Sequence, residues 1–176
     1  MNAPEAVDFT IQWSIRVSLI LVYTRLIYRL WRGQTAQFDK RTFEYSLWLV
    51  AFLFMVLHVC VSFHFVHQWA HSDAWDRTAI ETQRITGLRS GYGIWANYLM
   101  LAVWSLDLIR NTVAQKESRI PSLFVDRMVA FFFAFMFINA TAVFGPTGYR
   151  YLVLPALIPV LVIWRIKKAT ALPQRQ

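Results

Sequence analysis

The chain has 176 residues, of which 57% are hydrophobic and only 16% are charged, and its formal net charge is +8. Ordinary soluble domains contain about 25% charged residues, so this composition excludes a typical soluble domain. The apolar residues form long blocks separated by short charged loops, a pattern typical of polytopic membrane proteins. We therefore predict an all-α integral membrane bundle that forms a single domain over residues 1–176.

Five apolar blocks match or approach the roughly 20 residues that a membrane-spanning helix needs. The predicted membrane helices cover residues 11–31, 45–70, 92–109, 128–144 and 149–166. The first block contains Arg16 and Arg25, so an amphipathic helix on the membrane surface is an alternative there. Both arginines lie near a helix end, however, and can extend to the interface, which favours a spanning helix. Pro155 and Pro159 predict a kink in the last helix.

The segment between the second and third membrane helices has a helical pattern of its own. An amphipathic helix is predicted over residues 73–86, with ion pairs between Asp73 and Arg77 and between Arg77 and Glu81. Gly87 is a suitable end for this helix, because glycine adopts the left-handed conformation without strain. We expect the helix to lie outside the membrane, over the mouth of the bundle.

Basic residues are distributed unevenly among the loops. Residues 29–44, 110–127 and 165–176 carry four Lys or Arg each, whereas the alternate segments together carry only four. Basic loops remain in the cytoplasm, so the N-terminus is predicted outside and the C-terminus in the cytoplasm. The net positive charge then reflects topology and contact with anionic lipid, and we expect no nucleic-acid partner. Tryptophans mark the predicted outer helix ends (Trp13, Trp69 and Trp95) and inner helix ends (Trp31, Trp48 and Trp164).

Three of the four histidines lie in the stretch HFVHQWAH, at the outer end of the second predicted helix. At about 100° of rotation per residue, His64, His67 and His71 share one stripe of that helix. Histidines three or four residues apart can bind one metal ion, so His67 with either neighbour is a candidate ligand pair for zinc, copper or iron. Cys60 is the only cysteine, which excludes an internal disulfide.

Other polar residues are predicted at the depth of these histidines. Counting about 1.5 Å per residue from the outer helix ends places several polar groups in one layer. The predicted chamber is lined by Arg16, His64, His67, Asn97, Tyr98 and Asn139. Polar groups are costly in a bilayer unless they face the bundle interior and find partners, so this layer is the expected functional site. The outer helix with Trp75 is its predicted lid, and Gly91 and Gly93 are expected to allow close approach of backbone or a ligand.

A haem is an alternative occupant, with His58 as its candidate axial ligand. Bis-histidine haem usually takes its ligands from two helices, whereas the four histidines here belong to one predicted helix. A haem b site would therefore need Met100 or Met136, a five-coordinate iron, or a second copy of the chain. Asp107 lies far from this layer, and we expect it to pair with Arg110 or Arg25. The alternative for Asp107 is the inner end of a proton path.

The runs LHVCVSFHFVHQWAHSDAW, GIWANY and FINATAVF resemble those of uncharacterised small multi-pass bacterial membrane proteins. The resemblance covers most of the chain from the second predicted helix onward. It implies a location in the bacterial inner membrane, and it assigns neither a catalytic residue nor a cofactor.

Common catalytic motifs for hydrolases, nucleotide binding and zinc proteases are lacking in the sequence, so catalytic residues stay unassigned and enzymatic activity stays open. The leading hypothesis is a histidine-lined outer site that binds a transition metal or haem b, in redox chemistry or in a membrane complex. The first alternative is a non-enzymatic accessory subunit, indicated by histidines satisfied within the protein and by an exposed aromatic face on the fourth membrane helix. The second alternative is a proton or ion path. The expected partners are the lipid bilayer and either other membrane subunits or further copies of the chain.

Overall fold

A computed structural model of the chain describes residues 3–32, 38–117, 122–143, 148, 151, 157–163 and 165–166. The elements are α1 (Ala3–Arg32), α2 (Phe38–Phe65), α3 (His71–Thr86), α4 (Gly93–Lys116), α5 (Leu123–Ile138) and the π-helical segment η1 (Asn139–Val143). Over these described ranges the chain is helical with short turns and contains no β-strand. The all-α prediction is therefore confirmed for this part of the chain.

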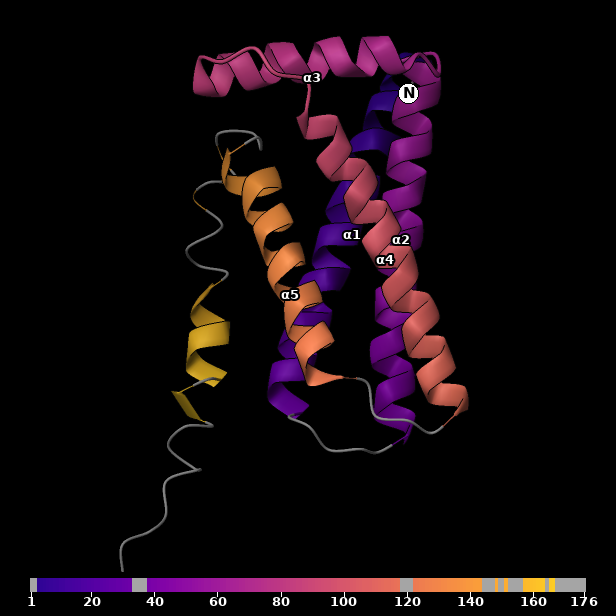
Figure 1. Ribbon diagram of the computed structural model, residues 1–176, viewed down its shortest axis with the longest axis vertical. Helices are drawn as coiled ribbons and strands as arrows, with labels where there is room; N and C mark the ends of the chain where they lie inside the picture. The colour runs from indigo at the N-terminus through magenta and orange to yellow at the C-terminus, as the bar shows by residue number, and fades with distance from the viewer. Residues whose placement is uncertain are drawn as a thin grey trace, which may run out of the picture.

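The four long helices α1, α2, α4 and α5 run alongside one another, while α3 lies crosswise over one end of them (Figure 1). Three helices within the described ranges are long and apolar enough to cross a membrane: Ala3–Trp31, Thr42–Phe65 and Leu123–Thr141. The first helix, for which the sequence allows a position on the membrane surface, is among these three and begins earlier than predicted, at Ala3. Within the predicted fifth helix, residues 149–166, the structure describes 151, 157–163 and 165–166, all of them helical, and the other positions lie outside the described residues.

Helices α1 and α2 approach each other closely through small side chains. Ser14 and Ser18 lie four residues apart on α1 and are only 3% and 0% exposed. The Ser18 hydroxyl donates a hydrogen bond of 2.8 Å to the backbone carbonyl of Ala51 on α2. Small residues at this spacing bring two membrane helices into close backbone contact, and the bond satisfies the hydroxyl away from water.

The core between α2, α4 and α5 is built around two tryptophans. The rings of Trp48 and Trp104 lie 4.4 Å apart between centroids, and Phe133 meets them edge-on at 4.8 and 4.9 Å. Aromatic pairs at such distances add to the stabilisation that burial alone provides. Trp48 is only 2% exposed and belongs to the core, whereas the sequence indicated only that it marks an inner helix end.

Helix α2 ends at Phe65, before the predicted boundary at residue 70. Gln68 and Trp69 have left-handed backbone angles, with φ of 48° and 59°, and a right-handed helix cannot continue through them. His67 consequently lies in the turn, and His71 is the first residue of α3. The predicted single helical stripe of three histidines is therefore wrong.

Candidate functional site

The histidine corner, which we define as His64, His67 and His71 with the turn 66–70, joins α2 to α3 and α4. The indole Nε1 of Trp69, in the turn, donates a hydrogen bond of 3.2 Å to Nδ1 of His64 at the end of α2. An indole can only donate, so the accepting nitrogen of His64 carries no proton. This bond ties the strained turn back to the helix that precedes it.

His67 links the turn to α3 through Asp73. Nδ1 of His67 donates to Oδ2 of Asp73 at 2.7 Å, and Nε of Arg77 donates to the same oxygen at 2.9 Å. The hydrogen bond from His67, followed by that from Arg77, lowers the pKa of Asp73 below its ordinary value. The predicted pair of Asp73 and Arg77 is confirmed, whereas Glu81 is bound by Arg84, at 3.0 Å.

His71 links α3 to α4. Its Nδ1 lies 3.0 Å from the hydroxyl of Tyr98 on α4. Close by, a Cβ atom added to Gly91 would lie only 2.4 Å from Cε2 of Trp75. The ring of Trp75 therefore packs directly against the backbone of Gly91. The group that approaches Gly91 closely is a side chain, Trp75, where the sequence predicted backbone or a ligand, and this contact packs α3 against the segment before α4.

Two other predicted chamber residues, Arg16 and Asn139, form hydrogen bonds within their own helices. Nη2 of Arg16 donates to Gln12 on α1 at 3.2 Å, and the amide of Asn139 donates to the Phe135 carbonyl at 2.9 Å. Asn97 is exposed on α4. Of the predicted site residues, the structure therefore joins Tyr98 to His71 and does not gather the rest into one chamber.

His58 lies deeper along α2 and faces α1. Its Nδ1 donates a hydrogen bond of 2.9 Å to the backbone carbonyl of Ile11. The four histidines thus bond to four different protein groups. In the part of the chain that the structure describes, no group of three or more His, Cys, Asp or Glu side chains is placed to hold a metal ion.

A second polar site, at the opposite end of the bundle, was largely missed by the sequence analysis. This inner ion network consists of Arg25 and Arg29 on α1, Glu44 on α2, Asp107 and Arg110 on α4, and Asp126 on α5. Glu44 lies 3.3 Å from Arg25 and 3.5 Å from Arg29. Asp126 lies 2.8 Å from Arg29 and 2.5 Å from Arg110. Arg110 in turn lies 2.6 Å from Asp107, so cations and anions alternate along an unbroken series of contacts. Three cations and three anions balance, and all four long helices contribute.

Asp107 is the most deeply buried member of the inner ion network, with a side chain only 2% exposed. Its Oδ2 accepts hydrogen bonds from Trp48 Nε1 at 2.9 Å and from Asn111 at 3.0 Å, in addition to the contact with Arg110. The guanidinium of Arg25 lies 4.2 Å from the Trp48 ring centroid, in cation–π contact. The predicted pair of Asp107 and Arg110 is confirmed, and the network extends it to α1, α2 and α5.

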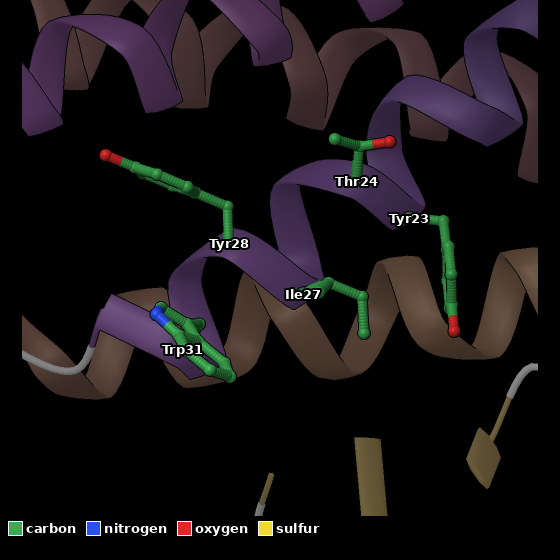
Figure 2. Close-up of a pocket in the computed structure, with 5 residues that line it drawn as sticks. All are labelled: Tyr23, Thr24, Ile27, Tyr28 and Trp31. Atoms are coloured by element: carbon green, nitrogen blue, oxygen red, sulfur yellow. The ribbon is translucent and has the colours of Figure 1, made fainter. Parts of the chain in front are cut away.

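An apolar groove of about 420 Å³ lies on α1, towards the end that carries the inner ion network. It is lined by Tyr23, Thr24, Ile27, Tyr28 and Trp31. Figure 2 shows the side chains of Tyr23, Ile27 and Trp31 along one side of the helix, as their spacing of four residues requires. The groove includes none of the predicted site residues and lies apart from the histidine corner.

Comparison with protein-family models finds none that matches this chain, and searches of curated proteins and of solved structures find no match either.

Proposed function

We propose that this chain is a non-enzymatic accessory subunit of a membrane complex. The observation that carries this proposal is the separation of the four histidines, each of which is hydrogen-bonded to a different protein group. Polar side chains in membrane bundles commonly form such interhelical bonds for structural reasons. A catalytic or metal-binding layer would instead bring several of these side chains together around one point.

The proposed topology is a bacterial inner-membrane protein with five spanning helices, its N-terminus outside and its C-terminus in the cytoplasm. The N-terminus and α3 lie at the same end of the bundle (Figure 1), and this end corresponds to the segments with few basic residues. α4 has 24 residues, long enough to cross, and its buried Asp107 is neutralised by the inner ion network. This pairing supports α4 as the third span in spite of its charges.

The proposed docking surface for the rest of the complex is the aromatic face of α5. It is formed by Phe124, Met128, Phe131, Phe135 and Ile138, whose exposed fractions lie between 49% and 72%. Successive residues of this face are separated alternately by four and three positions, which is the spacing of side chains at the contact between two packed helices. We propose that a helix of another subunit packs on this face.

A metal or haem site is the second candidate function, and one observation favours it. Nδ1 of His67 is bound to the Asp73 carboxylate, and Nδ1 of His58 to the Ile11 carbonyl. Metal-binding imidazoles are commonly oriented by such a bond, which leaves Nε2 for the metal. Zinc, copper, iron or haem b held in this way would need further ligands from a partner or from a second copy of the chain.

The deciding experiment is elemental mass spectrometry on the detergent-purified protein, with an absorption spectrum of the same sample. An accessory subunit is expected to carry substoichiometric metal and to lack a Soret band. Stoichiometric metal that is lost in His67→Ala but retained in the neighbouring Gln68→Ala would favour the second candidate.

The docking face can be tested by native mass spectrometry of the complex from gently solubilised membranes. The double variant Phe131→Ala, Phe135→Ala is expected to dissociate from its partner subunits. Leu53→Ala on α2, whose native side chain is similarly exposed at 55%, is the matched control. Equal dissociation of both variants would contradict docking through α5.

A further inference from the structure

We propose that residues 71–92, here called the α3 platform, lie in the headgroup layer of the outer leaflet and bind neutral phospholipid through aromatic and aliphatic side chains. This inference rests on the proposed topology. Its starting point is the crosswise position of α3 over the end of the long helices (Figure 1). A helix that crosses the end of a spanning bundle lies along the membrane surface, where amphipathic helices bind.

The two faces of α3 match this position. Ala74 and Ala79, both 3% exposed, are buried against the rest of the protein. Asp76, Gln83 and Arg84 are exposed elsewhere on the helix, and so is Ile80, at 57%. Part of α3 is thus covered by the bundle, and its exposed part carries polar side chains for the aqueous phase together with the apolar Ile80.

Exposed aromatic and aliphatic residues lie before and after α3, at the level where the long helices end. Trp69 is 62% exposed before α3, and Leu88 and Tyr92 are 73% and 71% exposed after it. Trp95, 55% exposed, continues this surface onto the first turn of α4, and Phe65, 56% exposed, continues it onto the end of α2. Tryptophan and tyrosine favour the headgroup region because their rings are apolar and their N–H or O–H groups remain hydrated.

The charges of the platform point to a neutral lipid rather than an anionic one. The platform carries three acidic and three basic side chains that pair with one another: Asp73 with Arg77, Glu81 with Arg84, and Asp76 with Arg89. A segment that binds anionic lipid electrostatically has an excess of Lys and Arg. Here each arginine is balanced by a carboxylate of the platform, so insertion of apolar side chains is the main source of attraction to the lipid.

The test uses nitroxide labels at single cysteines in a Cys60→Ser background, in the full chain reconstituted into phosphatidylcholine vesicles. A label in lipid collides more with oxygen, and a label in water collides more with a nickel chelate. We expect oxygen to be favoured several-fold at Leu88→Cys and the nickel chelate to be favoured several-fold at Gln83→Cys. Vesicles that also contain anionic phosphatidylglycerol are expected to give the same values.

Three outcomes would overturn the proposal. Nickel access at Leu88→Cys equal to that at Gln83→Cys would place the platform in water. Protection of Leu88→Cys from both reagents would indicate a covering protein, and a much deeper position with phosphatidylglycerol would indicate electrostatic binding. Leu53→Cys on α2 tests the topology separately, because a label there that does not favour oxygen would contradict the proposed span itself.

Discussion

The histidine corner joins neighbouring parts of the chain, whereas the inner ion network joins helices that are far apart in sequence. Two of the corner bonds, His64–Trp69 and His67–Asp73, connect residues separated by five and six positions. In the network, Arg29 and Asp126 are separated by 97 positions. The corner therefore sets a local change of direction, and the network determines how the long helices are assembled.

The two sites also differ in their exposure to solvent. The side chain of Asp73, the partner of His67, is 40% exposed, whereas the Asp107 side chain in the network is only 2% exposed. Exposed ion pairs contribute little to stability because water and salt screen them. A buried charge that loses its partner is strongly destabilising. Disruption of the network should therefore affect folding much more than disruption of the corner.

The largest effect is expected for Asp107→Ala in the inner ion network. The substitution removes the acceptor for Trp48 and Asn111 and one of the two carboxylates bound by Arg110. Loss of one member of a buried ion pair costs about 3–5 kcal/mol. We expect this loss in the free energy of unfolding, measured by denaturant titration in detergent micelles.

The matched control is Asp76→Ala on α3. Asp76 is 65% exposed and lies 3.9 Å from Arg89, so its removal should change stability by less than about 1 kcal/mol. Equal losses of unfolding free energy in the two variants would contradict the proposed difference in stability between the inner ion network and the exposed ion pairs of α3.

The next largest effect is expected for Gly91→Ala, which tests whether the corner depends on packing as well as on hydrogen bonds. The added methyl group would lie 2.4 Å from the Trp75 ring, so either α3 or the ring must move. Overpacking of this kind costs about 1–3 kcal/mol. Gly148→Ala is the control, because no atom lies within 4 Å of its added Cβ. Unchanged thermal unfolding of Gly91→Ala would show that this contact is easily rearranged.

The parts of the fold that depend on local sequence were predictable. Long apolar blocks indicated the three helices that are long and apolar enough to cross a membrane, and Gly87, with φ of 80°, ends α3 as expected. Asp107 and Arg110 could be paired because residues three apart lie on one helical face. Each of these features follows from spacing within a single helix.

The parts that depend on packing between helices were not predictable in the same way. The contacts of Glu44 and Asp126 with α1 depend on the rotation and depth of three helices relative to one another, which spacing along one helix does not give. The early end of α2 arises at Gln68 and Trp69, whose residue types ordinarily avoid left-handed backbone angles. The hydrophobic pattern continues through this turn, so it predicted a longer helix and a histidine stripe that does not form.

A smaller effect is expected for His67→Ala in the histidine corner. It removes one bond between the turn and α3, while Trp75 on Gly91 and His71 on Tyr98 still hold α3. We expect a smaller loss of thermal stability than in Gly91→Ala, together with greater mobility of a nitroxide label at Gln83→Cys. Unfolding of the whole bundle in this variant would contradict a local role for the corner.

The smallest effect concerns the titration of Asp73, which we would follow by carboxyl ¹³C NMR. Its pKa is lowered in the folded protein, so the bond to His67 contributes fully above the ordinary carboxyl value of about 3.9 and is lost as the pH falls through the lower folded value. His67→Ala should raise the pKa of Asp73 further than Arg77→Ala does, because the hydrogen bond from His67 is the larger cause of the shift. The reverse order would mean that Asp73 serves mainly to pair with Arg77 along α3, and the corner would then depend on packing alone.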